Sequence, residues 1–147
     1  MGSSSSGNCY YLATDNVQIL VDAGVPVRSL KHDLKERGLA LNDIDAVFIT
    51  HDHADHIKSL GTLGEKYNIP IYATRATHVG INKNYCMTQK LVSCMRYVEK
   101  EEPLRFRDFH VTPFEVPHDS NDNVGYLFEC DGKCFCFITD IGHITDT

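Results

Sequence analysis

Hydrophobic and polar positions follow two different periods along the chain, which predicts strands and helices in alternation. Apolar residues alternate with polar ones in two short runs, 9–13 and 17–21, which a Thr-Asp-Asn turn separates. This pattern is typical of a β-hairpin. Between 27 and 34 apolar residues fall at helical spacing, and Gly38 follows. Because glycine favours the left-handed residue after a helix, we expect an amphipathic helix that stops there.

The middle of the chain predicts a second cycle of strand and helix. A continuous apolar run at 46–50 reads as a buried strand, and apolar residues from 57 to 67 return to helical spacing. Residues 70–73 predict another strand. The segment 75–102 predicts helical or irregular structure, and the charged stretch 99–103 marks a solvated break.

The last third predicts antiparallel strands. Residues 109–116 alternate as a strand, and the stretch 125–139 forms two β-like runs around the pair Asp131-Gly132. An Asp-Gly pair favours a tight type I′ turn between two strands. We find no internal repeat, low-complexity tract or linker, so we expect one domain over residues 1–147.

Composition and charge narrow the class of protein. The chain has 147 residues, of which 42% are apolar, and no stretch reaches the roughly 18 apolar residues of a membrane span. The net charge of −6 argues against a broad basic face for nucleic acid, so an anionic substrate needs a local cation. The serine run after Met1-Gly2 lacks the features of a signal peptide, which predicts a cytoplasmic protein. The six cysteines form no CxxC pair, so we expect reduced thiols and no disulfide.

The stretch THDHADHIKSLG at 50–61 carries the candidate chemistry, since it holds His51, His53, Asp55 and His56 directly after an apolar strand. Imidazole and carboxylate ligands together suit zinc, manganese or iron. In an extended segment residues 51 and 53 point the same way and can chelate one ion. A turn into the following helix would aim Asp55 and His56 at a second, neighbouring ion. The alternative is a solvated acidic turn, which does not account for this ligand spacing.

The pattern HxHxDH at 51–56 resembles the signature of the metallo-β-lactamase superfamily. SSSSGN at 3–8 and VDAG at 21–24 resemble landmarks of its YycJ branch, also called VicX or WalJ. The resemblance implies an α/β fold, namely the N-terminal half of an αββα sandwich, with a mixed, mostly antiparallel sheet and flanking helices. Asp22 would then orient a ligand histidine from behind, although the residue could also be a plain turn residue.

Further ligands follow from the same resemblance. The stretch PHDSNDNVGY supplies His118, and FITD supplies Asp140, although each could be an ordinary loop or strand-end residue. The resemblance implies that one ion is bound by three histidines, the other by Asp55 and His56, and both by Asp140. The three histidines are His51, His53 and His118, and Asp55 is also the candidate catalytic residue.

Other titratable residues fit this pattern less well. His143 follows Asp140 by three residues, yet the resemblance gives it no ligand role. Cys134 and Cys136 alternate along a strand and could be a soft metal-ligand pair, but small core residues are the favoured interpretation. No role is assigned to His32, which we expect to be exposed, or to His78 and His110.

The function implied by the resemblance is that of a hydrolase with two divalent metal ions, zinc or manganese. Its favoured substrate is nucleic acid, DNA rather than RNA, cleaved as by an exonuclease. Thioester or lactone hydrolysis on the same fold is an alternative. The chain ends at Thr147, seven residues after Asp140, without the superfamily's last histidine ligand. We therefore expect a truncated domain with little or no nuclease activity, which retains as few as one ion and forms homo-oligomers through an exposed sheet surface. A metal-binding fragment without turnover is the second hypothesis.

Overall fold

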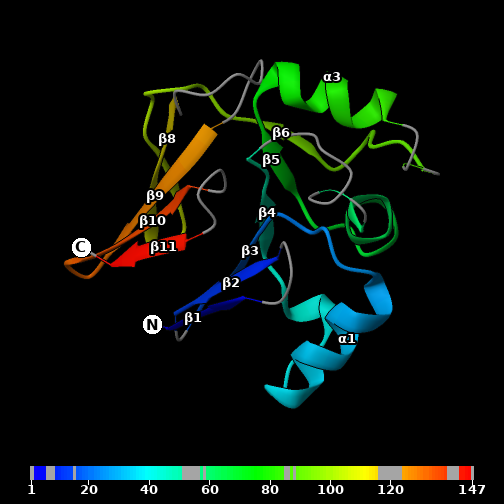
Figure 1. Ribbon diagram of the computed structural model, residues 1–147, viewed down its shortest axis with the longest axis horizontal. Coiled ribbons are helices and arrows are strands. Elements are labelled where there is room, and N and C mark those ends of the chain that lie inside the picture. Colours follow the sequence, from blue (N-terminus) through cyan, green and yellow to red (C-terminus); the bar gives the residue numbers. More distant parts are fainter. Residues whose placement is uncertain are drawn as a thin grey trace.

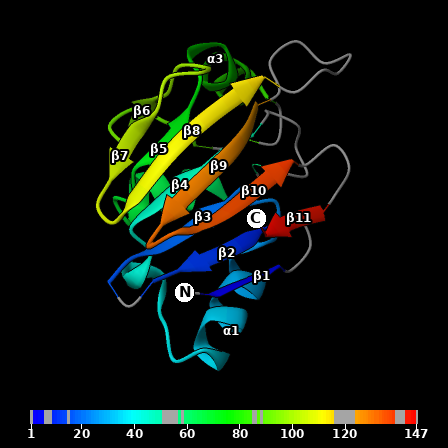
Figure 2. The same ribbon diagram turned by 90° about the vertical axis from the view of Figure 1, so that its left-hand side faces the viewer.

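Two β-sheets lie face to face, and helices cover the outer face of the first sheet (Figure 1). This arrangement comes from a computed structural model that describes residues 2–5, 9–14, 16–50, 57, 59–84, 87, 89–115, 124–138 and 143–146. Turned by 90°, the molecule shows the second sheet in front of the first (Figure 2). The layers agree with the expected α/β sandwich.

The first sheet is mixed. In the described chain its strand order is β1-β2-β3-β4-β5-β6, with antiparallel pairing from β1 to β3 and parallel pairing from β3 to β6. The hairpin predicted from the first two apolar runs is confirmed as β2 and β3. The strands are β1 (Gly2–Ser5), β2 (Tyr10–Ala13), β3 (Gln18–Val21), β4 (Ala46–Phe48), β5 (Ile71–Ala73) and β6 (Met95–Tyr97).

The second sheet is antiparallel throughout its described strands, in the order β11-β10-β9-β8-β7. Asp131 and Gly132 connect β9 to β10 with φ angles of 52° and 78°, which confirms the predicted type I′ turn. The strands are β7 (Leu104–Phe106), β8 (Phe109–Glu115), β9 (Val124–Cys130), β10 (Lys133–Ile138) and β11 (His143–Asp146).

Helices pack on the outer face of the first sheet. They are α1 (Val27–Glu36), the 3-10 turn η1 (Leu41–Asp43), the π-type turn η2 (Thr62–Lys66) and α3 (Arg75–Lys83). The end of α1 is a Schellman motif, in which the N–H of Gly38 donates to the Lys35 carbonyl at 3.0 Å and that of Leu39 to the Leu34 carbonyl at 2.8 Å. The predicted stop at Gly38 is confirmed, and its φ is 76°. In the described part of the chain, no helix has the length and hydropathy to cross a membrane.

The continuous apolar runs of β3 and β4 follow from burial on both faces. Leu20 and Val47 contribute to a core under the helices, whereas Ile19 and Phe48 contribute to a second core between the sheets. Neighbouring residues of a strand point to opposite faces. Each strand in the middle of the first sheet therefore needs apolar residues at every position.

Three expectations about strands are wrong or incomplete. The serine run, for which no strand was predicted, forms β1 against β2. The segment 75–102 contains α3 but also the strand β6, and β7 follows it. Cys134 and Cys136 are half-buried, on the face of β10 opposite the buried Phe135 and Phe137, so they are not core residues.

The expected uncovered apolar sheet is also not what the structure shows. The second sheet covers one face of the first, and the helices cover the other. On the outward face of the second sheet, Phe114 and Leu127 are half-buried. The large hydrophobic side chains that the described chain exposes lie elsewhere, at Val79, Val92 and Tyr97.

His78 connects α3 to two strands of the first sheet. Its side chain is 2% exposed, and its Nε2 lies 3.1 Å from the Ile71 carbonyl oxygen and 2.7 Å from that of Arg96. Since carbonyls only accept, Nε2 carries the proton. Nδ1 is buried without a partner among the described residues, and burial lowers the pKa of His78 below its ordinary value of 6.5.

This histidine should make stability depend on pH. Above pH 6.5 the ring is neutral in both the folded and unfolded chain, whereas below it the unfolded chain takes up the proton first. Stability is therefore lost as the pH falls from 6.5 through the lower pKa of the folded state. We expect the urea midpoint of the native chain to fall more between pH 8 and pH 5.5 than that of His78→Gln. Equal losses in the two proteins would refute a buried neutral ring.

Candidate metal centre

The carboxyl end of β4 is fixed by a buried carboxylate at the residue directly before the histidine-rich stretch. Asp22 accepts hydrogen bonds from the backbone N–H of Thr50 at 2.9 Å and from its hydroxyl at 2.8 Å. Both side chains are completely buried. The carboxylate thus sets the direction in which the chain leaves the strand toward His51.

Asp22 adopts an unusual backbone conformation to reach this position. It directly follows β3, its φ is 64°, and its N–H donates to the Phe48 carbonyl at 2.8 Å. Aspartate is among the residues that best tolerate a left-handed conformation. A buried residue held in this way often marks a functional site, because neighbouring contacts must stabilise it.

The far side of the histidine-rich stretch is tied to the same loop. The N–H of Ser59 donates to the Ala23 carbonyl at 3.0 Å, and its hydroxyl donates to the Val25 carbonyl. Thr50 and Ser59, the described residues before and after the histidine-rich stretch, are therefore both bonded to the short loop that follows β3.

Strands of the second sheet begin and end at this same edge. The N–H of Val124, the first residue of β9, donates to the Thr50 carbonyl at 3.0 Å. The hydroxyl of Tyr126 donates to the Ile49 carbonyl at 2.7 Å. Phe137 lies opposite Tyr126 in the pairing of β10 with β9, so the final residue of β10, Ile138, reaches the same edge. Three chain segments that carry predicted ligands are thus attached to one edge of the sandwich.

The structure describes some of the predicted site residues and not others. Asp22 is described, and it contacts Thr50 at the start of the histidine-rich stretch. His143 opens β11, where its backbone pairs with Ile138. The six predicted ligands lie outside the described residues, namely His51, His53, Asp55, His56, His118 and Asp140. Within the described chain, no three His, Cys, Asp or Glu side chains form a group suited to a metal ion.

The electrostatics near Asp22 keep a neighbouring thiol protonated. Burial, together with the negative charges of Asp22 and Asp33, raises the pKa of Cys9 to about 12. The same two kinds of effect, burial and Asp22, raise the pKa of Tyr10. A thiol that stays protonated at neutral pH is neither a nucleophile nor a ready metal ligand. The described chemistry at this edge is therefore that of carboxylate and hydroxyl groups.

Sequence reasoning missed the residues that position the edge. Thr50, Ser59 and Tyr126 act through hydrogen bonds to backbone or carboxylate groups that are distant in the sequence. In the sequence, the only sign of such a role was their position near the motifs. Thr50 and Ser59 flank the HxHxDH signature, and Tyr126 lies in the Gly-Tyr pair after His118.

Comparison with known proteins decides the family. Residues 17–147 match the sequence profile described as the β-lactamase superfamily domain. The chain belongs to the metallo-β-lactamase superfamily. The expected family and its fold are confirmed.

Relatives within the superfamily include two named exodeoxyribonucleases. The chain is 34% identical to exodeoxyribonuclease YycJ of Bacillus anthracis and 34% identical to exodeoxyribonuclease WalJ of Streptococcus pneumoniae. Each match covers 99% of this chain and 54% of the relative. It is also 30% identical to ribonuclease TTHA0252 of Thermus thermophilus, over 83% of this chain and 25% of that protein. The chain thus spans about half the length of the exodeoxyribonucleases that it matches.

Solved structures show the same fold. A B3 metallo-β-lactamase with an active-site glutamic acid gives a TM-score of 0.71 at 20% identity, covering 87% of this chain and 53% of that one. The B3 enzyme BJP-1 of Bradyrhizobium japonicum gives 0.69 at 18% identity, with coverages of 87% and 53%. The sandwich, with its helices on the first sheet, is therefore a metallo-β-lactamase fold.

Proposed function

We propose that this chain provides the metal-binding part of a hydrolase that cleaves phosphodiester bonds in nucleic acid, with DNA as the favoured substrate. The observation that carries the proposal is the common edge at which Thr50, Val124 and Ile138 meet. The histidine-rich stretch starts directly after Thr50, His118 precedes Val124 by six residues, and Asp140 follows Ile138 by two. These short sequence distances from described residues support a common location for the six predicted ligands.

The donor set suits divalent zinc or manganese. His51, His53 and His118 would bind one ion, Asp55 and His56 the other, and Asp140 both. Imidazole and carboxylate together are typical of catalytic sites for these metals. When bound, the ions would activate water and neutralise charge on phosphate oxygens.

The protein's own residues would orient this chemistry. Asp22 and Thr50 fix the position from which the chain enters the histidine-rich stretch, through two hydrogen bonds. Asp55 would be the catalytic residue, accepting a hydrogen bond from the attacking water and holding its proton. The relatives named exodeoxyribonuclease and ribonuclease support a nucleic acid substrate, and the two named exodeoxyribonucleases favour DNA.

A metal-binding domain without turnover is the second candidate. The chain spans 54% of the exodeoxyribonucleases that it matches, so their activity comes to this chain only as a proposal. In the second case the chain would bind the ions without cleaving nucleic acid. The experiment below separates the two candidates.

The purified chain should bind close to one zinc- or manganese-class ion, and His53→Ala should lose it. The reason is that a chelate with few ligands cannot spare one imidazole. With manganese present, the native chain should bind phosphorothioate DNA more tightly than in EDTA, and any slow cleavage of ordinary DNA should require the metal. Elemental analysis and a labelled-DNA assay measure these two effects.

Asp55→Ala is the control for contaminating nucleases, and circular dichroism checks that both variants fold. Metal bound by the native chain and retained by His53→Ala would refute the ligand assignment. An ion that changes neither binding nor cleavage of DNA would contradict the nuclease proposal and favour the domain without turnover.

A further inference from the structure

A cavity of about 380 Å³ lies at the opposite edge of the first sheet from the candidate metal centre. It is formed by Lys31 and Lys35 of α1, by the segment 39–42 that leads toward β4, and by Tyr67 after η2. Leu41 is buried at its base and gives it an apolar floor. We refer to this cavity as the α1 pocket.

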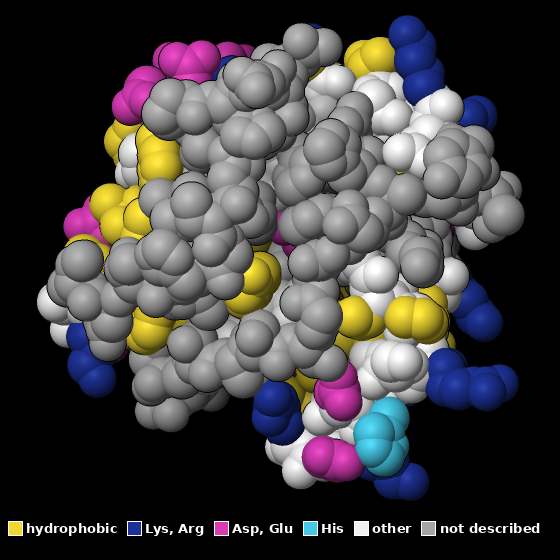
Figure 3. All heavy atoms as spheres, in the orientation of Figure 1, with side chains coloured by type: hydrophobic (Ala, Val, Ile, Leu, Met, Phe, Trp, Pro, Cys, Tyr) yellow, Lys and Arg dark blue, Asp and Glu magenta, His cyan; other side chains and the backbone are white. Residues whose placement is uncertain are grey.

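The α1 pocket combines cations with an aromatic ring. The ammonium groups of Lys31 and Lys66 each lie 5.9 Å from the centre of the Tyr67 ring. In the structure as described, neither they nor Lys35 form a salt bridge. Figure 3 shows dark blue basic side chains projecting from the lower right of the molecule, where Figure 1 places α1. These charges are available to an anion.

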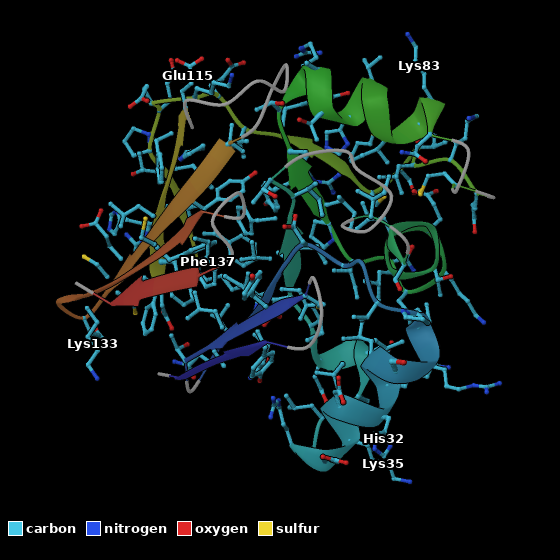
Figure 4. All side chains as sticks on the ribbon, viewed as in Figure 1. His32, Lys35, Lys83, Glu115, Lys133 and Phe137 are labelled. Carbon is cyan, nitrogen blue, oxygen red and sulfur yellow. The ribbon has the colours of Figure 1, made fainter. Side chains whose placement is uncertain are left out.

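Acidic side chains also lie on α1 and at the rim of the pocket, at Asp33, Glu36 and Asp43. Glu36 pairs with His32 at 2.8 Å. Asp43 accepts a hydrogen bond from the N–H of Ala40 at 2.8 Å, at the rim of the pocket. Figure 4 shows Lys35 beside His32 at the lower end of α1, pointing away from the protein. The two lysines that line the pocket therefore offer positive charge without an ion pair of their own in the described part of the chain, which has a net charge of −6 overall.

A nucleotide within a single strand matches this chemistry. Its phosphate needs one or two cations, and its flat base needs an aromatic surface on which to stack. We propose that the α1 pocket binds one nucleotide of single-stranded DNA, with the phosphate against Lys31 and Lys35 and the base on Tyr67. This inference rests on the proposed function, since it gives the substrate of the same protein a second contact.

The position of the pocket suits such a contact. Helix α1 begins five residues after Asp22 and runs for 10 residues, about 15 Å at 1.5 Å per residue. Lys31 and Lys35 lie further along this helix, beside the segment 39–42 that leads into β4, so a bound strand would have to run along α1 to reach the predicted ligands. A strand bound at both places would be held on the protein while its end is at the metal centre.

Binding of fluorescein-labelled oligothymidylate, followed by fluorescence anisotropy in EDTA, tests the proposal without cleavage. Lys31→Gln/Lys35→Gln should weaken binding about fivefold or more and reduce the slope of log K against log salt by about 0.7 per lost phosphate contact. Tyr67→Leu should weaken binding roughly tenfold with little change in that slope, because it removes stacking and no charge.

The matched control is Lys83→Gln/Lys133→Gln, which removes the same charge from two exposed lysines on α3 and β10 (Figure 4). It should change affinity less than twofold, and urea unfolding should show that all variants fold. Equal weakening by both double variants, or oligothymidylate that does not bind at all, would overturn the proposal. So would displacement by polyglutamate as effective as by unlabelled DNA, since this would indicate a site for any polyanion.

Two further outcomes separate this inference from the proposed function. If thymidine monophosphate competes as well as the strand, per nucleotide, the pocket is a free-nucleotide site and the strand contact is wrong. If DNA is cleaved with manganese while the pocket variants bind DNA normally, the proposed function stands and the α1 pocket is refuted. Selective loss of binding in EDTA supports the pocket even where no cleavage occurs.

Discussion

Asp22→Ala is expected to lower the free energy of unfolding by about 3 kcal/mol or more, and to reduce metal binding. The carboxylate is completely buried and accepts hydrogen bonds from the Thr50 N–H and hydroxyl. Removal takes away the acceptor of two hydrogen bonds from buried Thr50 donors, each loss at a cost of about 1–3 kcal/mol. Alanine also disfavours the φ of 64° by about 1 kcal/mol. Urea unfolding at neutral pH and elemental analysis measure the two effects.

Asp22→Asn is the matched control. Asparagine tolerates the left-handed conformation, keeps one oxygen acceptor and has almost the same volume. We expect it to lose about 1 kcal/mol and to fold normally. If folded Asp22→Asn binds metal as the native chain does, the site depends on the shape and hydrogen bonding of Asp22 and not on its negative charge. If Asp22→Ala unfolds at the native urea concentration, Asp22 does not hold the edge as described.

The parts of the fold that could be predicted depend on local sequence. The Asp131-Gly132 turn and the stop at Gly38 each need a positive φ, which few residues adopt easily. The continuous apolar runs of β3 and β4 indicate strands that are buried on both faces. In each case, the residues that show the pattern are the same residues whose backbone conformation or burial requires it.

Other elements depend on contacts that a local pattern does not record. β6 has half-exposed or exposed residues and no clear alternation, and it exists because it pairs with β5. β1 consists of glycine and serine and pairs through its backbone with β2. His78 was given no role from the sequence, yet the carbonyls of Ile71 and Arg96 hold it in the interior.

The candidate site also has one part that the sequence predicts and another that it does not. Ligand types and spacing are sequence properties, so the histidine-rich stretch could be recognised directly. The residues that hold the neighbouring chain in place could not be recognised from the sequence. Thr50 bonds to Val124, and Ile49 bonds to Tyr126, across more than 70 residues of chain. Asp22 was predicted to orient a ligand histidine. Its described bonds go to Thr50, and a bond to a histidine stays a prediction.

Gly125→Ala tests the close approach of strands that brings β9 and β10 to this edge. A Cβ at this position would lie 2.4 Å from the tip of the Phe114 ring and 2.9 Å from the Phe137 carbonyl oxygen. The ring belongs to the cross-strand partner of Gly125 and covers the space that a side chain would fill. The ring can move, but the carbonyl belongs to the backbone of β10.

We therefore expect Gly125→Ala to lower the free energy of unfolding by about 2–3 kcal/mol, in the range of overpacked cores. Phe114→Ala in the same chain should relieve the contact with the ring and leave the contact with the carbonyl. The double variant should consequently lose less than the sum of the two single variants, which urea unfolding of all four proteins measures as a coupling energy. Hydrogen exchange at the Val124 amide should also speed up in Gly125→Ala, because displaced strands weaken its bond to Thr50. Strict additivity of the two free-energy losses would mean that Phe114 does not cover Gly125. Unchanged hydrogen exchange at Val124 would mean that this packing does not affect the candidate metal centre.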